Sequence, residues 1–170
     1  YTPYSRKWLA KFDEEGIEYF PSEKHLDKFY KGSNLPELTM GDLGFIESKI
    51  TPKPFKFDNK TIDRYEETRN FPNIDSTSRL GVHLRFGTQS IRKLVQKSSK
   101  RKNNIFLKEL IWREFFMQII WHFPYTVNQC FKKKYDRIDY LNDEKDFEKW
   151  CNGKTGYPLI DAGMRQLNET

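Results

Sequence analysis

The chain has 170 residues, of which 36% are hydrophobic and 16% aromatic, so it is long enough to bury a core of its own. Charged residues make up 32% of it and interrupt its most apolar stretch, residues 105–123, and no signal-peptide pattern opens the chain, which excludes a membrane partner. The two cysteines, without C-x-x-C or Cys/His spacing, exclude a disulfide framework and a zinc site and indicate an intracellular, cytoplasmic protein with no bound metal.

The first third of the sequence shows little regular structure. Residues 1–8 carry a turn and the start of an amphipathic helix. Residues 24–60 combine prolines and glycines with little periodicity, which predicts an extended connector with short helical pieces. Residues 61–69 then predict a short polar helix, which ends before Pro72 because a proline disfavours the helical conformation in the residue that precedes it.

Helical patterns continue through the rest of the chain. Ser90 is predicted to cap a helix over residues 91–96, since its hydroxyl can accept from a free amide of the first turn. Asn103 or Asn104 is predicted to cap a long helix that runs to about Trp121. That helix is apolar on nearly every side and is therefore expected at the centre of the core. Because no alternating strand pattern follows residue 60, the predicted fold class is mainly α.

The net charge of +6 is concentrated in one part of the chain. Between residues 79 and 113 ten basic residues accompany a single acid, Glu109. The basic residues are Arg79, Arg85, Arg92, Lys93, Lys97, Lys100, Arg101, Lys102, Lys108 and Arg113. Such a field attracts a polyanion, and phosphate contacts would give salt-dependent affinity without sequence preference. A solvated basic loop over residues 97–104 is the alternative.

The most specific pattern lies near the end of the chain. Glycines and a proline in residues 150–158 predict a tight loop, and apolar spacing in residues 160–167 predicts a partly buried helix after it. The order of residues 150–167 also resembles the W-x-x-G-x-T-G-Y-P-x-[VI]-D-A-x-M-R-Q-L signature of the photolyase/cryptochrome flavoproteins. Two earlier blocks resemble the same family in the same order: residues 65–87, which include T-S-R-L-G, and F-L-K-E-L-I-W-R-E-F at residues 106–115.

The resemblance implies a domain organisation. The chain is similar to the first part of the family's helical FAD-binding domain, preceded by an irregular interdomain linker. Residues 1–46 would be the end of an antenna domain and the linker, and residues 47–170 the amino-terminal, truncated part of the FAD-binding domain. The later half of the family domain, which holds most contacts to the flavin ring, would follow, so these 170 residues alone are expected to be inactive.

The resemblance also implies the cofactor, FAD, and the residues that bind it. These are Tyr65, Thr77, Ser78, Arg79, Leu80, Gly81, Phe106 and Arg113. Two hydroxyls and successive amides suit a phosphate, although Gly81 stands in place of a serine and could contribute only its backbone. Without the resemblance, a Thr-Ser pair is an ordinary turn. A second antenna chromophore, folate or deazaflavin, would be bound by the preceding domain.

A substrate follows from the same resemblance: DNA containing pyrimidine dimers. Glu109 would hydrogen-bond the damaged pyrimidine and Trp112 would stack on the flipped dimer, as the two catalytic residues. Arg69 would join these two residues in contacting DNA, since base flipping requires basic groups for phosphates and an aromatic wall for the extruded base. The alternative is an ordinary ion pair between Glu109 and Arg113, four residues apart on a helix, with Trp112 in the core.

The function implied is light-driven repair: a monomeric carbon–carbon lyase splits cyclobutane pyrimidine dimers with an electron from excited, reduced FAD. Tyr140 stands where many family members carry the outermost tryptophan of an electron-transfer chain, and tyrosine is harder to oxidise unless it loses its proton. Two alternatives remain open. One is a cryptochrome-type blue-light photoreceptor without repair activity, and the other is a non-enzymatic helical module that binds nucleic acid.

Overall fold

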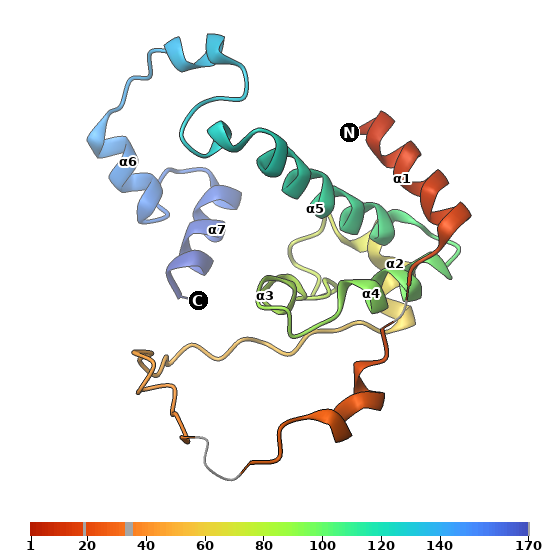
Figure 1. Ribbon diagram of the computed structural model, residues 1–170. Helices are drawn as coiled ribbons and strands as arrows, with labels where there is room; N and C mark the ends of the chain where they lie inside the picture. The colour runs from red at the N-terminus through yellow and green to blue at the C-terminus, as the bar shows by residue number, and fades with distance from the viewer. Residues whose placement is uncertain (19, 33–35, 170) are drawn as a thin grey trace. The chain divides into compact units, whose positions relative to one another are not determined.

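The computed structural model describes residues 1–18, 20–32 and 36–169. Within these residues every regular element is a helix, which confirms the mainly α fold class (Figure 1). Two compact units can be distinguished, Tyr1–Pro124 and Tyr125–Thr170. The predicted domain boundary at residue 46 stays a prediction.

The first unit opens with α1, Thr2–Glu15, which begins at once rather than after a turn. Tyr4, Trp8 and Phe12 recur every four residues along it and pack, partly buried, against the core, as expected for an amphipathic helix. The Trp8 Nε1 donates a hydrogen bond of 2.7 Å to Glu114 Oε2, so α1 is joined to residues 106 positions later. The helix ends at Gly16, whose φ of 70° is readily adopted only by glycine.

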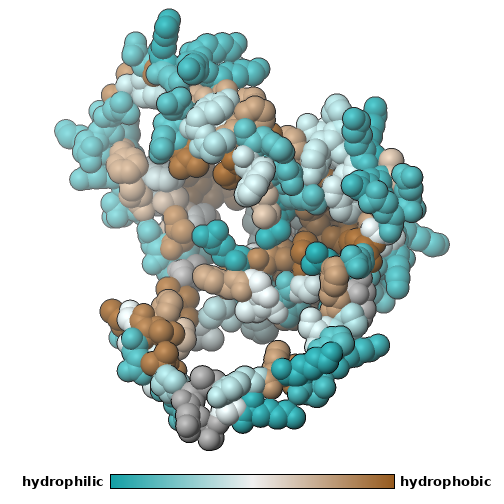
Figure 2. Space-filling view, in the orientation of Figure 1, coloured by the Kyte–Doolittle hydropathy of each residue, from teal (hydrophilic) through white to brown (hydrophobic). Residues whose placement is uncertain are grey.

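The predicted connector is confirmed in the described residues. After the 3₁₀ helix Ser22–Lys28, no helix forms in the described part of residues 29–58, and most of these side chains are exposed. Its exposed apolar residues include Phe45 and Ile46. Figure 2 shows brown, hydrophobic atoms over this part of the chain, at the lower left. The predicted polar helix is α2, Asn59–Thr68, which begins two residues early because the Asp58 carboxylate accepts from the Thr61 amide at 2.7 Å.

Two helices come after α2 along the chain. They are α3, Gly81–Arg85, and α4, Ile91–Ser99. The predicted Ser90 cap of α4 is confirmed, and the helix extends three residues further than predicted. Its buried face consists of Leu94, Val95 and Ser98. The buried Ser98 hydroxyl donates a hydrogen bond to the Leu94 carbonyl one turn earlier.

The long helix, α5, spans Ile105–His122, and its predicted start is confirmed. Asn104 holds the cap position, while the Asn103 side chain accepts from the Ile105 amide at 2.9 Å. The prediction of a central helix is correct for the first half only. Phe106, Leu107, Leu110 and Ile111 are buried where α1, α2 and α4 contact α5.

The second half of α5 is a correction to the sequence analysis. Phe116, Met117, Ile120 and Trp121 are all more than half exposed. Burial depends on the elements that pack on a helix, and in the first unit α1, α2 and α4 contact α5 and bury the residues of its first two turns. The apolar pattern therefore predicted the helix correctly, but it did not predict that the second half of the helix is exposed.

The second unit contains α6, Glu144–Cys151, and α7, Pro158–Glu169, which contact each other. Short 3₁₀ helices, Pro124–Val127 and Lys133–Arg137, precede them. Asp143 caps α6 by accepting from the Asp146 amide at 3.0 Å. The tight loop and the helix that follows it, predicted within residues 150–167, are confirmed, but the predicted burial of the apolar face is wrong, because Ile160 and Leu167 are 45% and 65% exposed. Across the described residues, none of the helices is both long enough and apolar enough to cross a bilayer.

Replacing Ile111 by alanine should lower the free energy of unfolding by about 2–5 kcal/mol, because the side chain is fully buried and its loss leaves a cavity among α1, α2 and α4. Ile46→Ala is the matched control, since that isoleucine is 94% exposed and should change stability by less than about 0.5 kcal/mol. Urea unfolding followed by circular dichroism measures both. Equal losses would contradict this account of the core.

Candidate functional site

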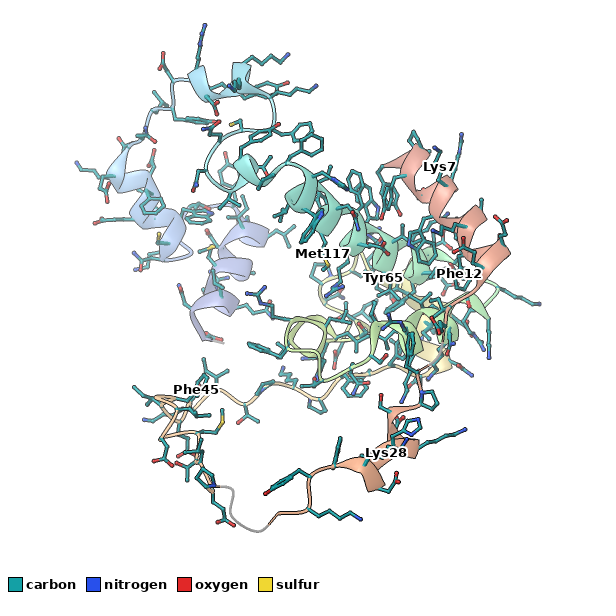
Figure 3. The ribbon with its side chains drawn as sticks, in the orientation of Figure 1. Lys7, Phe12, Lys28, Phe45, Tyr65 and Met117 are labelled. Carbon is teal, nitrogen blue, oxygen red and sulfur yellow. The ribbon has the colours of Figure 1, made fainter. Side chains whose placement is uncertain are left out.

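A cluster of four predicted site residues forms where α2 meets α5. The Arg69 guanidinium pairs with the Glu109 carboxylate and also lies over the Tyr65 ring, 5.2 Å from its centroid. Tyr65 in turn meets Phe106 edge to face, with ring centroids 5.1 Å apart. Tyr65, labelled in Figure 3, is one turn of α2 before Arg69, and Phe106 is about one turn of α5 before Glu109. Side chains from two helices thus converge on one place.

The charges in this cluster depend on one another. Burial raises the pKa of the Tyr65 hydroxyl, while the nearby Arg69 lowers it and Glu109 raises it further. The hydrogen bond to Glu109 raises the pKa of Arg69. The side chains of the pair are each about one-third exposed, so an incoming ligand can reach them. At neutral pH the site therefore presents a cation and an anion in contact beside two aromatic rings.

This pairing differs from the simpler alternative drawn from the sequence. Glu109 pairs with Arg69, which lies 40 residues away, and not with Arg113 one turn along the helix. Arg113 instead donates from Nη2 to the Leu84 carbonyl of α3, at 3.4 Å. The fold thus directs Glu109 toward α2 and Arg113 toward α3.

Trp112 lies on a further side of α5 and is half-buried. Its ring is stacked on that of Tyr1, with centroids 3.4 Å apart and an interplanar angle of 7°. Phe116 lies 5.4 Å away at 21°, and Phe115 meets the indole edge to face. The Tyr1 hydroxyl donates to the Lys108 carbonyl at 3.0 Å, which holds the stacked ring in place. Trp112 thus belongs to an aromatic group formed with α1.

The predicted phosphate loop, residues 77–81, lies in the segment after α2 and leads into α3. Leu80 is buried and anchors the loop in the core, while Thr77 and Gly81 are exposed. The Ser78 carbonyl accepts from the Lys56 amide at 2.8 Å. Arg79 has a positive φ of 55°, and its guanidinium reaches Asp75 at 2.6 Å. The first amides of α3 have no partner within the helix, because the first turn of any helix leaves its donors free.

The signature near the end of the chain is explained by hydrogen bonds around Asp161. This carboxylate is 8% exposed and accepts from the Thr155 amide and hydroxyl, at 2.8 and 2.6 Å, and from the Gly156 amide at 3.0 Å. The Thr155 hydroxyl is the main cause of a lowered Asp161 pKa. Sequence analysis missed this role of Asp161. The signal available in the sequence was an aspartate, Asp161, placed six residues after Thr155 in a glycine-rich loop.

The last predicted site residue, Tyr140, belongs to the second unit and is 70% exposed, in an irregular segment before α6. In the part of the chain that the structure describes, no group of three His, Cys, Asp or Glu side chains gathers as metal ligands would.

Comparison with known proteins identifies the family. A family model described as the FAD binding domain of DNA photolyase matches residues 106–170. The deoxyribodipyrimidine photo-lyase of Neurospora crassa is 35% identical over all of this chain and 33% of its own length, and that of Halobacterium salinarum is 34% identical over 78% of this chain and 30% of its own. A crystal structure of a class III photolyase from Agrobacterium tumefaciens has a TM-score of 0.59 and 38% identity over 63% of this chain and 24% of that one. The chain belongs to the photolyase/cryptochrome family.

Membership of the photolyase/cryptochrome family confirms FAD as the cofactor, whereas the second chromophore stays a prediction. The chain spans about a third of the length of the curated relatives that it matches, from 26% to 40%. The loop at residues 77–81 fits the FAD phosphates, because exposed hydroxyl and amide groups stand on a buried leucine anchor. Arg79 is held by Asp75, so its cofactor contact stays a prediction.

Replacing Gly153 by alanine should destabilise the protein by about 1–2 kcal/mol or more, because φ is 62° and the new Cβ would lie 2.8 Å from the Asp161 carbonyl oxygen. Gly163→Ala is a control of opposite sign. Gly163 lies within α7 with open space around its Cβ position, so alanine there should stabilise by about 0.5–1 kcal/mol. Thermal unfolding measures both variants, and a neutral Gly153→Ala would refute the tight loop.

Proposed function

We propose that this protein repairs DNA by splitting cyclobutane pyrimidine dimers in light, acting as a monomer within the cell. The observation that carries the proposal is the partly exposed Glu109–Arg69 pair beside Tyr65 and Phe106, one helical turn from Trp112. A carboxylate, a cation and a large ring are what recognition of an extruded pyrimidine dimer requires. The matched relatives in Neurospora and Halobacterium are deoxyribodipyrimidine photo-lyases, which supports the same assignment.

Each residue has a defined task in the proposed repair. When bound, FAD would supply the electron that reduces the dimer and would take it back after the ring has split. Glu109 accepts a hydrogen bond from an N–H of the damaged base, and Arg69 keeps that carboxylate in position. The Arg69 charge also offsets negative charge as it develops on the reduced dimer, where a preorganised cation is most effective. Tyr65 and Phe106 exclude water on one side of this pair.

Trp112 is proposed as the surface on which the flipped dimer stacks. The indole already accommodates the Tyr1 ring in a nearly parallel stack at 3.4 Å, the spacing at which a base would lie. Binding of a dimer on that face therefore requires Tyr1 to move, whereas Phe116 stacks at a longer centroid distance of 5.4 Å. Stacking on an aromatic ring contributes about 1–3 kcal/mol per base, which is enough to favour an extruded base in the site.

Tyr140 is proposed as the outer station of electron transfer to the flavin. The side chain is 70% exposed, so water is available to take the hydroxyl proton when the ring loses an electron. Coupled loss of the proton is what makes tyrosine oxidation accessible. We propose further that the electron lost by Tyr140 passes inward to the flavin, and that the preceding domain binds a folate or deazaflavin antenna chromophore.

Trp112→Ala should weaken binding to dimer-containing DNA by about 10- to 150-fold in the flavin-loaded protein, because a stacking surface is lost. Binding to undamaged DNA and flavin content should change little. Trp121→Ala is the matched control, since that indole is on the same helix and 80% exposed. Fluorescence anisotropy with damaged and undamaged duplexes measures the difference. Loss of folded protein in Trp112→Ala alone would instead assign the ring to the core formed with Tyr1.

Glu109→Gln should lower the repair yield per absorbed photon by about tenfold or more while weakening dimer binding only a few-fold, since a carboxylate matters most when charge develops on the substrate. Glu67→Gln, an exposed position on α2, serves as the control. The gain in absorbance at 260 nm under blue light, as splitting restores the 5,6 double bonds of the two pyrimidines, reports the yield. An unchanged yield in Glu109→Gln, or no repair by the unmodified protein, would favour a cryptochrome-type photoreceptor.

A further inference from the structure

A second group of cations lies at a distance from the Arg69–Glu109 pair. Lys93, Lys97, Lys100 and Arg101 recur at four- and three-residue spacing, so they share one face of α4 and the turn that follows it. With Gln96 and Asn59 they line a surface pocket of about 360 Å³. We call these six residues the α4 basic pocket. A neighbouring hollow of about 440 Å³ shares Lys100 and Arg101 and adds Lys102.

Two of these cations form ion pairs, of which the first is exposed and the second part-buried. Lys93 Nζ lies 3.1 Å from a Glu23 carboxylate oxygen, and Arg101 forms a forked pair with Asp63, with 2.8 Å from Nε to Oδ1. Exposed ion pairs contribute little to stability, so a phosphate can replace the Glu23 carboxylate at little cost, whereas the forked Arg101–Asp63 pair is part-buried.

Lys97 is held differently and gives the pocket a fixed cation. Its ammonium donates to the Phe57 carbonyl and lies 4.9 Å from the centroid of the Phe57 ring. The Asp58 carboxylate is nearby and caps α2. Five cations, counting Lys102, thus face four acids, Glu23, Asp58, Asp63 and Glu66, and the pocket keeps a net positive charge.

The shape of the α4 basic pocket suits a chain of phosphates. Lys93 and Lys100 are seven residues apart, which is about 10 Å along a helix axis. Successive phosphates of one DNA strand rise about 3.4 Å along the duplex axis, so the lysine row matches about three of them. The six lining residues include no aromatic side chain on which a base could stack. The pocket can therefore read backbone charge but not bases.

The α4 basic pocket is also close enough to the candidate dimer site for one DNA molecule to reach both. Asn59 begins α2 and lines the pocket, while Arg69 follows the last residue of the same helix and pairs with Glu109. Ten residues of helix span about 15 Å. That distance corresponds to roughly four base pairs of duplex.

We propose that the α4 basic pocket binds backbone phosphates of DNA beside the dimer site and holds undamaged duplex as well as damaged duplex. The identity of this ligand rests on the proposed function, whereas the preference for phosphate follows from the pocket. Lys93 and Lys100 contact phosphates directly, and Lys97 keeps the row in place through Phe57.

The test is the salt dependence of binding to undamaged duplex by the flavin-loaded protein. Lys93→Gln with Lys100→Gln should make the slope of log affinity against log salt shallower by about 1.8 and weaken affinity at 0.1 M salt by up to about 60-fold, as expected for two lost phosphate contacts. Lys97 is left unchanged because it supports Phe57. Lys28→Gln with Lys31→Gln, two exposed lysines of the connector, removes the same charge and should leave the slope nearly unchanged.

Glu23→Gln gives a second measurement with the opposite sign. It removes the carboxylate that competes for Lys93, so affinity for duplex should rise about two- to fivefold and the slope should steepen. This variant loses one exposed pair only, so its folding is not at risk.

Unchanged slopes in the double lysine variant, with dimer repair intact, would overturn the α4 basic pocket as a DNA site and leave the proposed function standing. A shallower slope in a protein that repairs no dimer would support the pocket and refute the repair function. Inorganic tripolyphosphate distinguishes the source of phosphate. If it binds in a Lys93- and Lys100-dependent way while duplex slopes stay unchanged, a soluble polyphosphate is the occupant and the DNA assignment is wrong.

Discussion

Burial of the first two turns of α5 is the constraint on which the first unit depends. Ile111 on that helix and Ile62 on α2 are both fully buried, and α1, α2 and α4 contact the same stretch of α5. The residues of α1 and the end of α2 each also hold a polar side chain of α5, and α3 holds a third. The same helix therefore directs Glu109 toward Arg69, Arg113 toward Leu84 and Glu114 toward Trp8. The packing that forms the core therefore also places the side chains of the candidate site.

The basic residues between 79 and 113 are neighbours in the sequence but have different partners in the folded protein. Arg79 is taken up by Asp75 and Arg113 by a backbone carbonyl, whereas the α4 basic pocket gathers cations at the surface. Arg69, outside this range, supplies the cation beside Glu109. Charge density in a sequence thus indicates that a polyanion is attracted, and the fold decides where.

Local signals predicted the helices well. Ser90 and Asn103 or Asn104 marked two helix starts because caps are made within three residues of the chain. The order of three blocks placed the chain in its family. Long-range features were not predictable in this way. The Arg69–Glu109 pair joins residues 40 positions apart, and exposure of the second half of α5 depends on which helices pack against it.

The docking of α1 has a consequence for how this chain tolerates change. The hydrogen bond from Trp8 to Glu114 closes a loop of more than a hundred residues, which makes it a contact of high sequence separation and a slow one to form during folding. Much of that loop is the exposed connector, and the entropy of closing a flexible loop grows only with the logarithm of its length, about 0.6 kcal/mol for each doubling. Insertions into the connector should therefore accumulate among relatives at little thermodynamic cost, while the two ends of the loop stay docked.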